Sequence, residues 1–167
     1  MQVFKKIRFY SHEKTLDLAK HLQETFLGIR EWEYASLEFN RWYDFGKFKV
    51  KHFPVVHQPG NVAGGFILEV KGKRIAITRD TGPEILRNHE LLEEIQGADL
   101  LVSEMTQKYS IPKTHLGVED AIKFAQKVEA NKTLFVHISH SNYAHEELEE
   151  KVGENGIVGR DFMVLRI

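Results

Sequence analysis

The stretch KTLFVHISH, residues 132–140, limits the possible folds more than any other part of this sequence. Residues 134–136 form an apolar run that is long enough for a buried strand and too short for a helix. His137 follows this run directly, and His140 comes three residues later. Because open α/β sheets bind their ligands at the carboxyl ends of the strands, His137 is a candidate binding residue.

Two other strand-like segments end on the same kinds of side chain. FPVVH ends at His57, and RIAITRD ends at Asp80. His115 precedes a predicted helix, and the chain between His115 and His137 has room for one helix and one strand, which would return both to the same sheet edge. Imidazoles and carboxylates are the ligands that bind zinc, manganese or iron. The sequence therefore predicts a metal site at one edge of a sheet.

Each of these residues also has an ordinary explanation when it is taken alone. The chain has nine histidines, and most histidines in proteins are surface residues or satisfied polar groups of the core. Asp80 precedes Thr-Gly-Pro and could simply form a turn. Glu104, near the end of another strand, could pair with a lysine, and His52 is expected on a strand face. Only the joint pattern favours a functional site.

Composition excludes several classes of function. The 167 residues include 23 basic and 24 acidic side chains, and the net charge of −1 argues against nucleic-acid binding by bulk charge. With no cysteine, the chain has no disulfide, thiolate zinc site or cysteine nucleophile. The sequence has no signal-peptide pattern and no run of about 18 apolar residues. We therefore expect a soluble, cytoplasmic protein that does not contact a membrane.

Hydrophobic periodicity predicts strands alternating with helices, which is typical of a layered α/β sandwich. Strands are expected at residues 6–10, 31–39, 47–53, 66–70, 74–78, 98–105 and 134–136, with one or two more in 156–167. Helices are expected at residues 12–26, with Ser11 as N-cap and Gly28 as stop, and at 84–95, 118–128 and 145–152. A hairpin turn is expected at residues 71–73. Since no linker, repeat or low-complexity segment interrupts the pattern, residues 1–167 are expected to form one domain.

Five segments of the sequence resemble a known family. The segments FPVVH, GGFILEVKGKRIAITRDTG, ADLLVSEMTQ, KTHLGVEDAIKFAQK and KTLFVHISH are similar to the second half of the metallo-β-lactamase fold, a layered αββα sandwich. The branch they resemble is that of the phosphodiesterases, which includes tRNA 3′-processing endonucleases and cyclic phosphodiesterases of phosphonate metabolism. The resemblance covers the chain from residue 7 to its C-terminus.

The resemblance implies a role for each residue that matches a motif of the family. His57 would bind a metal, Asp80 would bridge two metals, and His137 would bind the second one. His115 would contact the scissile phosphate or protonate the leaving group. The implied cofactor is zinc or manganese, with up to two ions in the complete fold, and the implied substrate is a phosphodiester, either a small molecule or RNA.

Two further side chains are candidates for orienting these groups. His140 could hold His137 in position, and Glu104 could accept a hydrogen bond within the site. A serine-hydrolase mechanism is excluded because the sequence has no Gly-x-Ser-x-Gly elbow, and nucleotide binding is not expected because it has no Gly-rich phosphate loop.

One motif of the family is absent. No His-x-His-x-Asp-His occurs in these 167 residues, although this motif supplies most metal ligands in the family. The fold is therefore expected to be incomplete, with its first half missing, and the chain to supply only part of a hydrolase site. The alternative is a catalytically silent half-domain that binds a partner, either a second copy of itself or a separate N-terminal chain.

Overall fold

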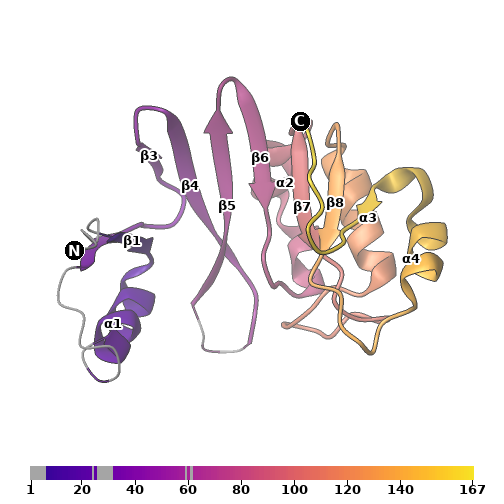
Figure 1. Cartoon of the computed structure of the whole chain (residues 1–167), viewed down its shortest axis with the longest axis horizontal. Coiled ribbons are helices and arrows are strands. Elements are labelled where there is room, and N and C mark those ends of the chain that lie inside the picture. The colour runs from indigo at the N-terminus through magenta and orange to yellow at the C-terminus, as the bar shows by residue number, and fades with distance from the viewer. Residues whose placement is uncertain (1–6, 24, 26–31, 59, 61) are drawn as a thin grey trace.

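A mixed β-sheet with helices on one face forms most of the structure (Figure 1). The computed structural model describes residues 7–23, 25, 32–58, 60 and 62–167. The sheet has the strand order β3 (Trp42–Asp44), β4 (Phe48–Val55), β5 (Ala63–Val70), β6 (Lys73–Ile77), β7 (Leu100–Glu104), β8 (Thr133–Val136) and β9 (Ile157–Val158). Strands β3 to β6 pair antiparallel, and β6 to β9 pair parallel. The parallel half brings the carboxyl ends of β6, β7 and β8 to one edge.

The N-terminal part of the chain forms a second, smaller sheet. Strands β1 (Ile7–Ser11) and β2 (Trp32–Ser36) pair in parallel, and α1 (Glu13–Leu22) follows β1. The N-cap of α1 is His12, whose Nδ1 accepts a hydrogen bond from the backbone N–H of Lys14. The prediction of Ser11 as N-cap was wrong, because the strand continues through that residue. The predicted helix end at residue 26 and the stop at residue 28 lie outside the described residues.

Strands β5 and β6 form the predicted hairpin. Lys71 and Gly72 connect them with φ angles of 50° and 75°, so both lie in the left-handed region. Two successive residues with positive φ match the right-handed twist of paired strands. The hairpin prediction is confirmed, although the turn is one residue shorter than expected because Lys73 already belongs to β6.

The predicted helix at residues 84–95 is interrupted. A 3₁₀ helix, η2 (Pro83–Arg87), comes first, and α2 (His89–Ile95) follows it. The backbone of Asn88 leaves the helical region between them, and its side chain accepts a hydrogen bond from the N–H of Leu91 at 3.2 Å. Asparagine favours such caps because its short side chain satisfies a free N–H group of the first turn. The single-helix prediction was therefore wrong at residue 88.

The remaining predictions are confirmed in part. Helices α3 (Val118–Val128) and α4 (His145–Val152) have the predicted bounds. Strand β3 lies in the stretch that was expected only to connect two strands. The C-terminal segment forms only the two-residue strand β9, after the 3₁₀ turn η3 (Gly153–Asn155), and residues 159–167 are irregular.

The core lies between the sheet and helices α2 and α3. Ile67, Ala76 and Leu101 are adjacent across three strands, and all three are fully buried, as is Phe124 of α3. Apolar residues of α3 recur at helical spacing, so one face of the helix packs on the sheet. Within the described part of the chain, no helix combines the length and the apolar character needed to cross a membrane.

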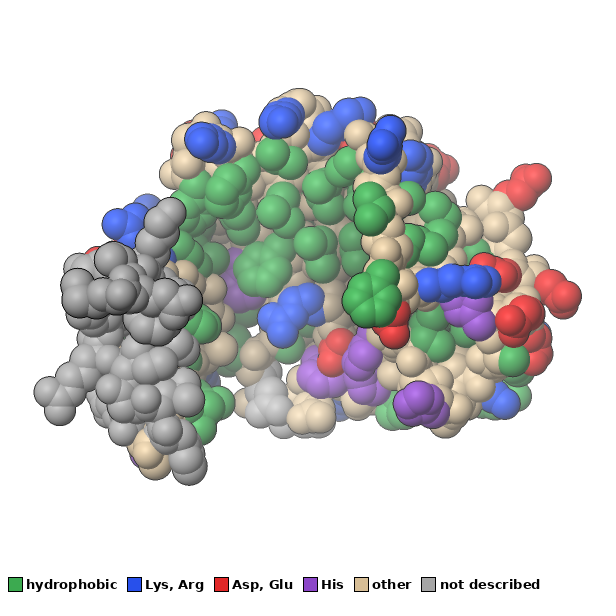
Figure 2. Space-filling view, in the orientation of Figure 1, with side chains coloured by type: hydrophobic (Ala, Val, Ile, Leu, Met, Phe, Trp, Pro, Cys, Tyr) green, Lys and Arg blue, Asp and Glu red, His purple; other side chains and the backbone are tan. Residues whose placement is uncertain are grey.

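The opposite face of the sheet also carries apolar side chains. Phe66, Ile77, Val102, Leu134 and Ile157 follow one another across β5 to β9, and all five are partly exposed. Figure 2 shows this face, where hydrophobic side chains cover the middle of the sheet. We call these five residues the open sheet face.

Candidate metal centre

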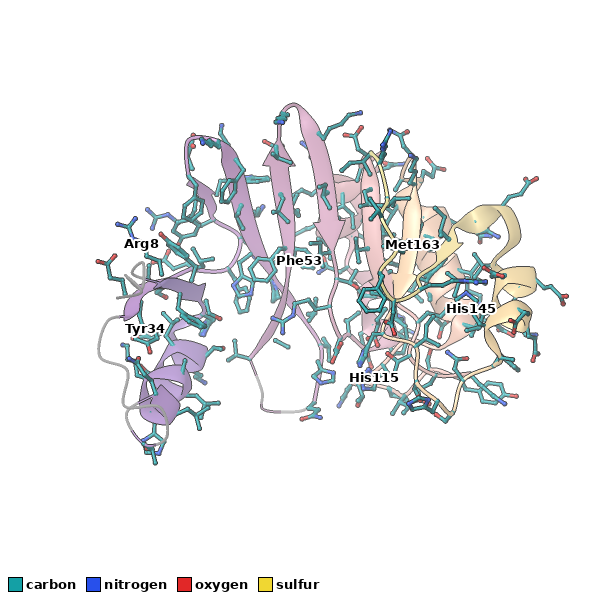
Figure 3. All side chains as sticks on the ribbon, viewed as in Figure 1. Arg8, Tyr34, Phe53, His115, His145 and Met163 are labelled. Carbon is teal, nitrogen blue, oxygen red and sulfur yellow. The ribbon has the colours of Figure 1, made fainter. Side chains whose placement is uncertain are left out.

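Five predicted residues gather at the carboxyl ends of β6, β7 and β8. Asp80 follows β6, Glu104 ends β7, and His137 comes directly after β8. His57 follows β4, and His115 comes from the loop between β7 and α3. Figure 3 shows His115 at this end of the sheet. The predicted meeting of these side chains at one edge is observed.

His57, Asp80 and His115 form the first group that could hold a metal ion. One ligand atom from each residue lies within 4.8 Å of the ligand atoms of the other two. The Nδ1 atom of His57 lies 2.8 Å from the backbone carbonyl oxygen of Thr114. Because a carbonyl oxygen only accepts, Nδ1 carries the hydrogen, and Nε2 of the neutral ring has a free lone pair for a metal.

Glu104, His115 and His137 form the second group, again within 4.8 Å of one another. The carboxylate of Glu104 is 1% exposed, and its Oε2 lies 2.8 Å from Nδ1 of His115. Glu104 also accepts hydrogen bonds from the backbone N–H of Thr81 and the hydroxyl of Thr106. A buried carboxylate needs such donors, and these hold it at the centre of the site.

His137 joins the end of β8 to the end of β6. Its Nδ1 lies 2.9 Å from Oδ1 of Asp80 and 3.1 Å from the hydroxyl of Thr106. The backbone of His137 has a φ of 57°, a left-handed conformation that is uncommon outside glycine. Half of the His137 side chain is exposed, so it lies at the outer rim of the site. A strained residue with charged partners at a strand end is typical of a functional site.

The donor set fits a divalent metal. Three imidazoles and two carboxylates meet at one edge, and these groups suit zinc, manganese and iron. His57 and His115 each have a hydrogen-bonded Nδ1. Their partners, the carbonyl oxygen of Thr114 and the carboxylate of Glu104, are of the kinds that usually orient a metal-binding imidazole.

The geometry differs from the sequence assignment in one respect. His115 belongs to both groups, whereas the sequence reasoning gave it a catalytic role only. His57, Asp80 and His137, predicted as the ligands, do not share one group. The roles of these residues stay predictions, as does the assignment of any one metal.

His140 belongs to neither group of candidate ligands. Its side chain is exposed, and within the described residues no hydrogen bond links it to His137. Asp80 and Thr106 instead contact Nδ1 of His137, so the orienting role of His140 stays a prediction. Sequence reasoning missed Thr106, although its spacing of two residues from Glu104 was a usable signal. The carbonyl oxygen of Thr114 gave no such signal.

The fold and the site agree with a match to a known family. Residues 3–138 match the family model described as a beta-lactamase superfamily domain. The chain belongs to the metallo-β-lactamase superfamily.

Relatives and solved structures of this superfamily are longer than the chain. It is 26% identical over 161 residues to a UPF0173 metal-dependent hydrolase of Christiangramia forsetii, and the match covers 90% of this chain and 65% of that protein. A new diphosphatase from the PhnP family superposes with a TM-score of 0.80 at 21% identity, over 98% of this chain and 59% of that one. The short form of human tRNase Z superposes with a TM-score of 0.68 at 19% identity, over 97% and 68%. The chain thus spans less than two thirds of the length of the first relative and of the diphosphatase.

Proposed function

We propose that this chain supplies part of the active site of a metal-dependent hydrolase that cleaves phosphodiester bonds. The observation that carries the proposal is the cluster of His57, Asp80, Glu104, His115 and His137 at the carboxyl edge of the sheet. The curated relative is named a metal-dependent hydrolase, and the two structural neighbours are a diphosphatase and a tRNase. Superfamily members share the fold and differ in substrate, so the substrate class is argued from the site itself.

His57, Asp80 and His137 are the residues we propose to hold zinc or manganese. A divalent metal bound there would supply charge stabilisation for the phosphate and a water that loses its proton near neutral pH. Asp80 contacts His137 across the site, so its carboxylate keeps the ends of β6 and β8 in a fixed relation.

His115 is the proposed general acid. Its Nδ1 donates to the buried carboxylate of Glu104, so the proton available for transfer is on Nε2. When both ring nitrogens carry a proton, Nε2 could pass its proton to the leaving oxygen while Nδ1 stays bonded to Glu104. The pair would therefore assist departure of the alcohol formed when the phosphodiester bond breaks.

Hydrolysis of bis(p-nitrophenyl) phosphate by the purified chain with added Mn²⁺ or Zn²⁺ tests the proposal. We expect turnover that requires metal, and its loss in His137→Ala. His89→Ala, an exposed residue at the start of α2, is the matched control and should retain activity. No bound metal by elemental analysis, together with no turnover at any metal concentration, would contradict this function for the chain.

A second candidate function rests on a different observation. The open sheet face carries apolar side chains on the side away from α2 and α3, and such faces favour association. We propose as the alternative that this face binds a polypeptide, either a second copy of the chain or a separate chain that carries the His-x-His-x-Asp-His motif. Light scattering coupled to size-exclusion chromatography tests it: a dimer supports the first partner, and a monomer that forms no complex with such a chain contradicts both.

A further inference from the structure

A cavity of about 550 Å³ adjoins the proposed metal centre. Asp80 and His57 line the end near the centre, and His12 and Lys14, at the start of α1, also line it. The cavity thus extends from the reacting position toward the N-terminal part of the chain. A molecule bound at the metal centre would have space there for a part that is not hydrolysed.

The side chains of the cavity are mostly cationic or neutral. Arg79 and Lys14 are the two basic residues, and Asp80 is the one acidic residue, among the described residues of the lining. Asp80 already contacts His137. In the described part of the chain, neither the Arg79 guanidinium nor the Lys14 ammonium forms an ion pair. Two unpaired cations beside a metal centre favour an anionic ligand.

Arg79 has an unusual backbone for its residue type. Its φ is 56°, in the left-handed region, directly before Asp80. Non-glycine residues in this conformation are strained, and such strain is concentrated where function requires a particular placement of the chain. His137 has the same conformation at the end of β8. One of these two residues, Arg79, directly precedes Asp80, and the other, His137, contacts Asp80.

His52 is a buried polar side chain in the wall of the cavity. Its side chain is 3% exposed and lines the cavity, yet its Nδ1 has no hydrogen-bond partner among the described residues. The ring packs between Phe39 and Phe66, with centroid distances of 4.4 and 4.7 Å. Nδ1 is itself shielded from solvent, so His52 contributes to the wall of the cavity and is not counted among the groups that bind the anion.

We propose that this cavity binds a second phosphate group of the substrate, next to the phosphate that is hydrolysed. This proposal rests on the proposed function, because the bound molecule is a substrate only if the metal centre hydrolyses it. Binding of the anion in the cavity needs no turnover. Arg79 matches a phosphate because its guanidinium can donate two parallel hydrogen bonds to one anionic group. Lys14 adds a point charge, and the two cations suit a ligand with several oxygens and more than one negative charge.

Phosphate binding by the metal-free protein tests the inference directly. Chelation of metals removes the competing site, and calorimetric titration with inorganic phosphate and with pyrophosphate then reports on the cavity. We expect both anions to bind, and Arg79→Gln to weaken binding at least tenfold. Arg87→Gln, an exposed arginine of η2 that does not line the cavity, should bind as the unchanged protein does. Absence of binding, or equal binding by Arg79→Gln, would overturn the inference.

Further measurements distinguish a loss of phosphate binding in the cavity from misfolding and from a loss of metal binding. Lys14→Gln should weaken phosphate binding in the same direction, which keeps the inference testable if Arg79→Gln fails to fold. The metal content of Arg79→Gln should equal that of the unchanged protein. Acetate should bind at least tenfold more weakly than phosphate, and equal affinity would overturn the assignment to phosphate. Because phosphate binding is measured without metal, it can succeed or fail independently of hydrolysis.

Discussion

The buried carboxylate of Glu104 accepts a hydrogen bond from Nδ1 of His115 at 2.8 Å. Glu104 ends β7, in the middle of the parallel strands, and His115 comes from a loop, so this contact fixes the loop against the sheet. The carboxylate has two other donors, Thr81 and Thr106, and is 1% exposed. A single acidic side chain therefore organises the second group of the centre.

Glu104→Gln tests the contribution of the carboxylate charge at nearly constant side-chain size. The variant keeps the size of the side chain, but its amide nitrogen cannot accept from Thr81, Thr106 or His115. We expect kcat/KM for bis(p-nitrophenyl) phosphate to fall about 10–100-fold, the usual effect of removing a residue that orients a metal-site histidine. Stability should fall by about 1–3 kcal/mol, because a buried donor loses its acceptor. Urea unfolding and steady-state kinetics measure the two effects.

The control for that experiment is Glu119→Gln. The Glu119 side chain is 87% exposed at the start of α3 and contacts Lys123 at 3.8 Å. Surface substitutions of this kind change stability by less than about 0.5 kcal/mol. Unchanged kinetics in Glu104→Gln would show that the His115 contact has no part in catalysis.

Metal binding should stabilise the folded chain. Zinc or manganese at a free concentration of 100 Kd is expected to raise the free energy of unfolding by about 2.7 kcal/mol, provided that the unfolded chain does not bind it. His57→Ala should lose most of this gain, because a ligand of the first group is removed. Thermal unfolding with and without metal, followed by addition of chelator, measures the difference.

His21→Ala is the matched control, since His21 is an exposed histidine of α1 outside both groups. It should show the same metal-dependent gain as the unchanged protein. An equal gain in His57→Ala would mean that the metal binds elsewhere.

Two phenylalanines of opposite exposure test the position of the core. Phe135 of β8 is fully buried, whereas Phe162 in the C-terminal segment is fully exposed. Phe135→Ala should destabilise the chain by about 3–5 kcal/mol, because it leaves a cavity between the sheet and the helices. Phe162→Ala should change stability by less than about 0.5 kcal/mol. Similar urea midpoints for the two variants would contradict this view of the core.

Local signals explain which elements the sequence predicted. Helices α3 and α4 have a clear apolar period, and the β5–β6 hairpin has a lysine–glycine turn with positive φ at both residues. Each of these is determined by residues close in sequence. Strand β3 is different, because its three residues are a strand only through their pairing with β4. The break at Asn88 depends on a side-chain cap that competes with a continuous apolar period.

The site was predictable where it depends on strand ends, and for the loop that carries His115 the sequence predicted only its return to the same edge. His57, Asp80 and His137 follow apolar segments, so parallel topology alone brings the last two to one edge. The position of His115 depends on the loop after β7, where its backbone N–H bonds to the carbonyl of Ile111 at 3.0 Å. No periodic pattern encodes that loop, so the sharing of His115 between two groups could not be read from the sequence.

Burial lowers the pKa of His52 from its ordinary value of 6.5, a backbone hydrogen bond with Leu37 opposes this, and electrostatic interactions with His12 and Arg79 lower the pKa further. The unfolded chain therefore takes up a proton at this residue more readily than the folded chain. It follows that the contribution of neutral His52 to stability is fully present above about pH 6.5 and is lost as the pH falls below that value toward the pKa of the folded state.

His52→Gln cannot titrate, so its stability should fall less than that of the unchanged protein between pH 7.5 and pH 5. Urea unfolding at both pH values gives the two differences, and the comparison removes the contribution of the other histidines. His140→Gln removes an exposed histidine and should leave the pH dependence unchanged. If His52→Gln and the unchanged protein lost the same free energy over this range, the buried imidazole would not be the group that titrates. A smaller loss in His52→Gln alone would assign the acid sensitivity of the fold to the ring that lines the proposed phosphate cavity.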